Sequence, residues 1–162
     1  LRMRFKTSQT AMPSASPVKT RETLRQAGEA FAQEKCVVMF PSGKLAQLRD
    51  GALQEREWFS TVVGLAKKQK ARVIPLNLRA RNSQLYYFLS KVNGELRDIT
   101  LFHELLNKRR TRFAMTFGEA IEPEDLHGPG TEVTATLQDY VAYGLGEAPD
   151  LTFRQFRDRR GS

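Results

Sequence analysis

Apolar residues recur along the chain at two different spacings, which predict helices alternating with short strands. Leu24, Ala27 and Phe31 are spaced to line one face of a helix that Thr20 would cap. The unbroken apolar run at residues 36–40 predicts a buried strand directly after this helix. A second helix is expected over residues 57–69, with lysines at its end. A second buried strand follows over residues 72–78, in which Pro75 removes a ladder donor and indicates an edge, a bulge or the end of the strand.

The same pattern continues through the second half of the chain. It predicts helices at residues 82–92 and 99–109, an alternating strand at 112–117, and a helix at 132–145 followed by a basic tail. Residues 42–55 lack this periodicity and are expected to form a long functional loop. Because helices that follow strands cover the faces of a sheet, we expect an α/β fold with a mixed, largely parallel sheet flanked by helices.

Composition adds a strong positive charge to this picture. The 162 residues, enough for one core, include 26 Lys and Arg against 18 Asp and Glu, a formal net charge of +8. Basic clusters at residues 67–72, 108–112 and 154–160 are either solvated helix ends or a surface that attracts an anionic bilayer. Nucleic acid is not expected as a partner, because the aromatic residues fall at core-like helical spacing. The single cysteine, Cys36, is expected to be a small buried residue in a reducing compartment.

The turn after the first predicted strand is the best candidate for a ligand site. Pro41 cannot extend a strand ladder, and Ser42, Gly43 and Lys44 can face an anionic ligand or form an ordinary Pro-Gly turn. A nucleotide-binding P-loop would require glycine in place of Val38 and a hydroxyl residue in place of Leu45. The sequence therefore excludes a P-loop and leaves a smaller site at the end of a strand, where open α/β sheets bind ligands.

Neither histidine completes a recognisable catalytic or metal-binding pattern. A zinc-protease helix would need a second histidine where Asn107 follows His103. A His-x4-Asp dyad is absent too, because Lys108 and Glu132 occupy the aspartate positions after His103 and His127. We expect no metal, and we expect both histidines to be structural.

In their order along the chain, several short motifs resemble the C-terminal part of a glycerolipid acyltransferase of the lysophospholipid acyltransferase superfamily, in its hemolysin-like branch. The Phe-Pro-Ser-Gly turn is similar to the Phe-Pro-x-Gly block of that family. The resemblance extends over residues 21–123. The other segments that contribute to it are residues 58–67, 71–76, 80–90, 104–109 and 117–121.

The resemblance implies transfer of a fatty acyl group from acyl-CoA or acyl carrier protein to a hydroxyl of a lysophospholipid, glycerol phosphate or similar lyso-lipid, without a further cofactor. Ser42 stands where the commoner block has glutamate, and Leu45 where many members have arginine, which leaves open an acceptor without a glycerol phosphate head group. Arg81 and Asn82 would lie beside the site, although Asn82 could equally cap a helix. The implied substrate-binding residues are Phe40, Pro41, Ser42, Gly43, Lys44, Arg81 and Asn82.

The family's catalytic Asn-His-x4-Asp block has no counterpart before Phe40. We expect either a fragment of a longer enzyme, which the start at Leu1 favours, or an inactive relative. The chain alone should not turn over substrate. The expected organisation is a basic segment at 1–19, the acyltransferase-like part at 20–125, and a helix and basic tail at 126–162. The expected location is the cytoplasmic face of the membrane, held by peripheral contact. The alternative is a non-enzymatic basic module that binds an anionic lipid surface, nucleic acid or a protein partner.

Overall fold

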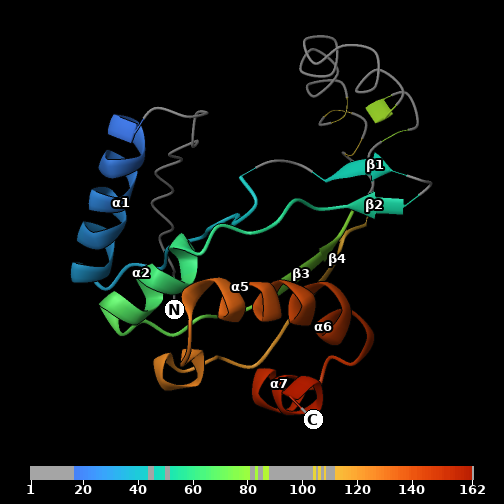
Figure 1. The fold of residues 1–162 in the computed structure, drawn as a ribbon. Helices are drawn as coiled ribbons and strands as arrows, with labels where there is room; N and C mark the ends of the chain where they lie inside the picture. Colours follow the sequence, from blue (N-terminus) through green and yellow to red (C-terminus); the bar gives the residue numbers. More distant parts are fainter. Residues whose placement is uncertain are drawn as a thin grey trace, which may run out of the picture.

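The computed structural model of the protein describes residues 17–43, 46–49, 52–80, 83, 86, 87, 104, 106, 108 and 112–161. Its helices and strands confirm a mixed α/β composition (Figure 1). Both described strand pairs are antiparallel. The parallel part of the expected sheet is not seen among the described residues, and the predicted helices at 82–92 and 99–109 lie largely outside them.

The first two predicted helices are present with shifted starts. Helix α1 spans Pro17–Ala32 and begins before Thr20, with a proline at a helix start, where its missing N–H costs nothing. Helix α2 spans Thr61–Gln69 and ends at Lys70, whose left-handed backbone directs its N–H to the carbonyl groups of Ala66 and Lys67. The helix periodicity was therefore a better guide to where these helices end than to where they begin.

The predicted strand at residues 36–40 is wrong. These residues are neither helical nor paired in a sheet, and Val38 is 74% exposed and Phe40 is 79% exposed. Cys36 is exposed as well, so the prediction of a small buried residue is also wrong. An apolar run becomes a buried strand only when neighbouring strands and a covering layer meet it, and the described residues supply neither.

The predicted loop at 42–55 contains a β-hairpin instead. Strand β1, Gln47–Arg49, pairs antiparallel with β2, Ala52–Gln54, with Gln47 opposite Gln54. The sequence signal for this hairpin is the dipeptide Asp50-Gly51 between the two strands, one of the compositions that two-residue hairpin turns prefer.

A second antiparallel pair joins distant parts of the chain. Strand β3, Leu76–Arg79, pairs with β4, Ala114–Phe117, so that Leu76 lies opposite Phe117 and Leu78 opposite Met115. A further bridge joins Val73 to Ile121. Both strands were predicted, but β3 is not the buried strand that was expected, since Leu78 is 48% exposed.

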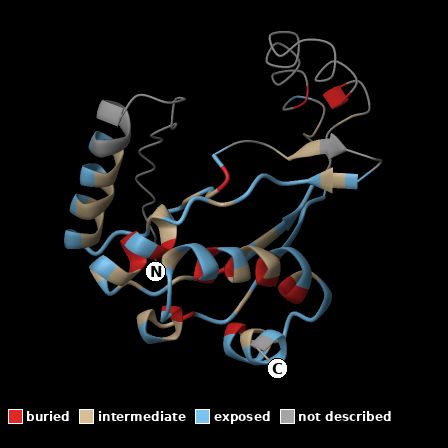
Figure 2. Cartoon of the chain, viewed as in Figure 1, coloured by how far each residue is buried: buried red, intermediate tan, exposed pale blue. Residues whose placement is uncertain are grey.

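The core lies where α2 meets the C-terminal helices (Figure 2). The predicted last helix is confirmed as α5, Gly130–Asp139, continued by a π-helical turn, η3, Tyr140–Gly144, and by α6, Leu145–Glu147. Before it comes a 3₁₀ turn, η2, Pro123–Leu126, and after it comes α7, Phe153–Gly161, within the predicted basic tail. The buried residues of this core are Val63, Ala66, Ile121, Leu126, Val133, Leu137, Tyr140, Val141, Leu145 and Phe153.

Tyr140 organises the packing of α7. Its ring is fully buried and meets the rings of Phe153 and Phe156 at centroid distances of 5.6 and 5.5 Å. Its hydroxyl donates a 2.7 Å hydrogen bond to the carbonyl of Leu151, and burial together with the charge of Glu119 raises the pKa of this hydroxyl. Phe153 and Phe156 thus place α7 against the core, although the tail is rich in arginine.

No helix in the described part of the chain combines the length and the apolar character needed to cross a bilayer.

Candidate functional site

The Phe-Pro-Ser-Gly turn has a well-defined conformation. The N–H of Gly43 donates to the carbonyl of Phe40 at 3.0 Å, which closes a four-residue turn with Pro41 at its second position. Gly43 has a φ of +61°, in the left-handed region that glycine adopts without strain. The carbonyl of Pro41 accepts a hydrogen bond from the N–H of Phe59 at 3.1 Å, which ties the turn to the approach to α2.

Ser42 points inward from this turn. The residue is only 4% exposed, and its hydroxyl donates a 3.0 Å hydrogen bond to a carboxylate oxygen of Glu55. The hairpin explains how Glu55 arrives there: with Gln47 paired to Gln54, the chain after β2 runs back toward the turn from which β1 leaves. Glu55 was not identified from the sequence, and the Asp-Gly hairpin signal could have found it.

This arrangement has a clear electrostatic consequence. The hydroxyl of Ser42 and the N–H of Gly43 both already donate within the protein. A carboxylate beside the turn repels a phosphate and can accept a hydrogen bond from a hydroxyl. The described part of the turn is therefore better suited to a hydroxyl-bearing ligand than to an anion.

The structure brings together four of the seven residues predicted for substrate binding. Phe40, Pro41, Ser42 and Gly43 form the turn, with the side chain of Phe40 exposed and that of Ser42 buried. Lys44, Arg81 and Asn82 lie outside the described residues. Their contribution to a site remains a prediction.

A buried carboxylate is the centre of a second polar cluster. Glu104 is 4% exposed and accepts hydrogen bonds from the backbone N–H of Ser83, at 2.8 Å, and from the Ser83 hydroxyl. The Nζ atom of Lys108, four residues further along the chain, lies 3.5 Å from a carboxylate oxygen of Glu104. Burial alone would raise the pKa of Glu104, but the hydrogen bonds from Ser83 and the charge of Lys108 outweigh it, so that this pKa lies below its ordinary value.

This cluster joins two of the segments that contribute to the family resemblance. The hydroxyl of Ser83 also accepts a 3.2 Å hydrogen bond from the N–H of Tyr86, as in a helix cap. Glu104, a helical residue of the segment 104–109, thus binds the capped turn in the segment 80–90. The sequence offers Asn82 as a helix cap, whereas the hydrogen bond from the N–H of Tyr86 assigns a capping role to its neighbour Ser83.

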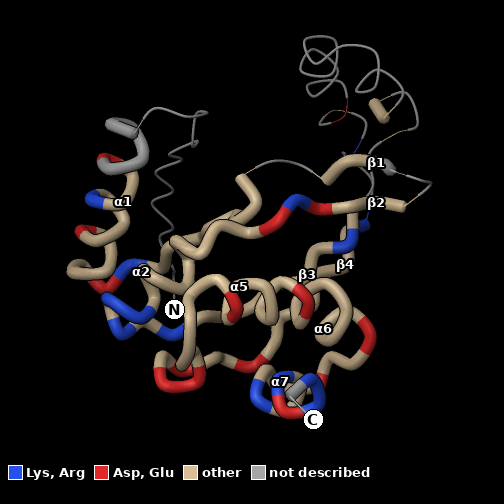
Figure 3. Tube along the Cα trace, in the orientation of Figure 1, with Lys and Arg blue, Asp and Glu red and all other residues tan. Residues whose placement is uncertain are grey.

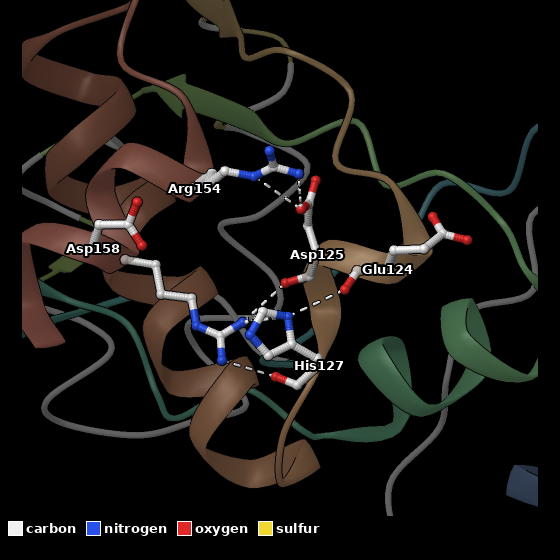
Figure 4. A pocket seen from close by; sticks show the side chains of 6 residues that line it. Glu124, Asp125, His127, Arg154 and Asp158 are labelled. Atoms are coloured by element: carbon white, nitrogen blue, oxygen red, sulfur yellow. Dashed lines mark hydrogen bonds and ion pairs between the residues drawn. The ribbon is translucent and has the colours of Figure 1, made fainter.

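A hollow of about 360 Å³ lies between η2 and α7 (Figure 4). Arg154 donates to a carboxylate oxygen of Asp125 at 2.6 and 3.1 Å, and Arg157 donates to the carbonyl groups of Asp125 and His127 at 3.0 and 2.9 Å. The ring of His127 lies 3.2 Å from the carbonyl of Glu124. These bonds hold α7 against η2. We therefore assign the residues that line the hollow a structural role rather than a role in ligand binding.

The positive charge forms separate groups on the surface (Figure 3). Lys67, Lys68 and Lys70 gather at the end of α2, where Lys67 donates to the carbonyl of Gly128 at 2.8 Å. In α7, Arg154 pairs with Asp125 and Arg160 with Asp139. Three arginines of α7, Arg154, Arg157 and Arg160, thus take part in bonds within the protein, while Lys68 and Lys70 are exposed cations. Among the described residues, no group of three or more His, Cys, Asp or Glu side chains is placed to share a metal ion.

Two known proteins are similar to part of this chain. The chain is 26% identical over 108 residues to a lyso-glycine lipid O-acyltransferase of Phocaeicola vulgatus, a match covering 63% of this chain and 39% of the relative. It is 27% identical over 97 residues to a lyso-glycine lipid O-acyltransferase of Bacteroides thetaiotaomicron, covering 56% of this chain and 36% of the relative. The chain thus spans about two-fifths of the length of these relatives.

No protein-family model and no solved structure matches the chain. The two relatives nevertheless support a relationship to lipid O-acyltransferases, in agreement with the motifs in the sequence. They do not test the assignment to the hemolysin-like branch.

Proposed function

We propose that this chain is part of a lipid O-acyltransferase that transfers a fatty acyl group from acyl-CoA or acyl carrier protein to a hydroxyl of a lyso-lipid. The similarity to two lyso-glycine lipid O-acyltransferases is the observation on which this proposal rests. Its remaining elements follow from the motifs: peripheral contact with the cytoplasmic face of the membrane, and a catalytic histidine supplied by an Asn-His-x4-Asp block outside this chain.

The acceptor we propose lacks a phosphate next to its reacting hydroxyl, as a lyso-glycine lipid would. The support is the pair formed by Ser42 and Glu55, which places a carboxylate beside the turn where an acceptor head group would bind. A glycerol phosphate head group would bring its negative charge toward that carboxylate. A hydroxyl can instead donate to it.

The test is an acylation assay on the longest product of the gene. Acyl-CoA and acyl carrier protein loaded with a fatty acyl thioester are each offered with a lyso-glycine lipid, a lysophosphatidic acid or glycerol phosphate, and the release of free thiol from the donor is followed. We expect thiol release with the lyso-glycine lipid and loss of it when the block histidine is replaced by alanine. If the longest protein that the gene encodes contains the Asn-His-x4-Asp block but acylates no lyso-lipid, the proposal is wrong.

The 162-residue chain by itself is expected to release no thiol. If the longest product lacks the histidine block altogether, the alternative of a non-enzymatic basic module takes over. The exposed lysines at the end of α2 favour a lipid surface as the ligand of such a module.

A further inference from the structure

The two faces of the β3–β4 pair differ in polarity, and the polar face is the one that lies against the helices. One face is directed toward the C-terminal helices: Asn77 donates a 2.7 Å hydrogen bond to the carbonyl of Val141, and Arg79 donates to the carbonyl of Gly146. The other face, which we call the outer face, consists of large apolar side chains. They are Ile74, Leu76, Leu78, Phe113, Met115 and Phe117.

The outer face is open to solvent in the described part of the chain (Figure 2). Its side chains are between 38% and 63% exposed, Leu76 being the least exposed and Phe117 the most. In an antiparallel sheet with one solvated face, the polar residues belong on the solvated side. Here the more apolar side is the solvated one, which is the pattern of a strand pair built to be covered on both faces.

We propose that the outer face is the docking surface for a second layer of polypeptide, formed by the part of a lipid O-acyltransferase that this chain does not span. This inference rests on the proposed function. The relatives have more than half of their length outside the match with this chain, enough for such a layer. The π-helical turn η3 contacts β3 and helix α6 contacts β4, so the inner side of the pair already has a covering layer. In α/β proteins a second layer covers the opposite side of the sheet.

The experiment uses a paired substitution that keeps the strands compatible. Leu78 and Met115 lie directly opposite each other, so Leu78→Glu with Met115→Lys makes the outer face polar while creating a favourable cross-strand pair and leaving the net charge unchanged. The matched control, Ala135→Glu with Ala142→Lys, places the same two charges at exposed helical positions away from this face.

The first measurement is made on the 162-residue chain alone. We expect a monomer in sedimentation that binds the dye anilinonaphthalene sulfonate, with at least half of the fluorescence lost in the Leu78→Glu/Met115→Lys variant and none in the control. A dimer that this variant dissociates would assign the face to a second copy. A monomer whose dye binding the variant does not reduce would mean that the face is covered by the chain itself. Either result overturns the proposal.

The second measurement uses the Phocaeicola vulgatus relative from which the segment matching this chain has been removed. Co-expressed with this chain, that polypeptide should co-purify one-to-one with the unmodified chain and with the control, but not with Leu78→Glu/Met115→Lys. A complex that survives this variant, or a folded polypeptide that forms none, overturns the proposal. If the polypeptide is insoluble alone, it is fused to this chain, and an equal melting temperature for variant and control then overturns the proposal.

Complex formation is measured without turnover, so the two proposals fail separately. A complex that depends on the outer face but acylates no lyso-lipid rejects the proposed function and leaves the docking surface standing.

Discussion

The hydroxyl of Ser42 donates a 3.0 Å hydrogen bond to the carboxylate of Glu55, thirteen residues further along the chain. The commoner family block has a glutamate at the position of Ser42, and here a carboxylate reaches the same turn from the end of a hairpin. This contact places a carboxylate beside the turn of the candidate acceptor site and adds to the backbone hydrogen bonds that hold the turn.

Replacement of Ser42 should test this contact directly. Ser42→Ala loses one hydrogen bond and should lower the free energy of unfolding by about 1 kcal/mol. Ser42→Glu should lower it further, because a second carboxylate would then be placed in a buried position beside Glu55. Urea denaturation of the two variants measures both effects.

The double variant Ser42→Glu/Glu55→Gln provides the control, since it removes the repulsion and should recover part of the stability that Ser42→Glu loses. Glu57→Gln, at an exposed carboxylate nearby, should change little. If Ser42→Glu is as stable as the unmodified chain, the contact is not present in solution.

Glu104 should make the stability of the domain dependent on acid pH. Its pKa is lower in the folded chain than in the unfolded chain, so its contribution is fully present above the ordinary pKa, near pH 4.3, and is lost as the pH falls through the lower folded value. Glu104→Gln should cost about 2 kcal/mol at neutral pH, since a hydrogen-bonded buried charge is removed.

The measurement is chemical denaturation between pH 7 and about pH 3, over which the difference between the unmodified chain and Glu104→Gln should narrow. Glu57→Gln serves again as the exposed control and should show no such narrowing. A difference that stays constant with pH would mean that the carboxylate of Glu104 is not stabilised by its partners.

Replacement of glycine by alanine should have opposite effects on the free energy of unfolding at two positions. A Cβ at Gly144 would lie 2.9 Å from ring atoms of both Phe156 and Tyr140, so Gly144→Ala should lower the free energy of unfolding by about 1–3 kcal/mol. A Cβ at Gly64 meets nothing within 4 Å on α2, so Gly64→Ala should raise it by roughly 0.5–1 kcal/mol. Thermal unfolding of the two variants measures both effects. Equal shifts of their melting temperatures would contradict the packing described around Tyr140.

The exposed lysines of α2 should contribute to membrane binding. We expect the chain to bind anionic vesicles more tightly than neutral ones and to lose this preference in high salt. Lys68→Gln/Lys70→Gln should weaken binding to anionic vesicles by about 2 kcal/mol, roughly 30-fold, if each lysine contributes about 1 kcal/mol.

Arg154→Gln is the matched comparison, because Arg154 already pairs with Asp125 and should contribute less to vesicle binding. Cosedimentation measures all three proteins. Equal binding to anionic and neutral vesicles would remove the membrane role proposed for the charge.

The sequence by itself determined the features that depend on neighbouring residues. Helix α5 and the end of α2 follow from apolar periodicity and basic residues in the last turn, because helical hydrogen bonds and side-chain contacts are local. The ordered motifs also indicated lipid acylation, and two relatives support that class.

Only the tertiary structure decided which apolar residues are buried and which polar groups meet. The run at residues 36–40 and the apolar side of β3 look like core in sequence, yet they are exposed, because burial depends on a covering layer that periodicity cannot supply. The contact between Ser42 and Glu55 and the one between Ser83 and Glu104 likewise join residues 13 and 21 positions apart. Such contacts are set by strand register and by the return path of the chain, which are properties of the whole fold.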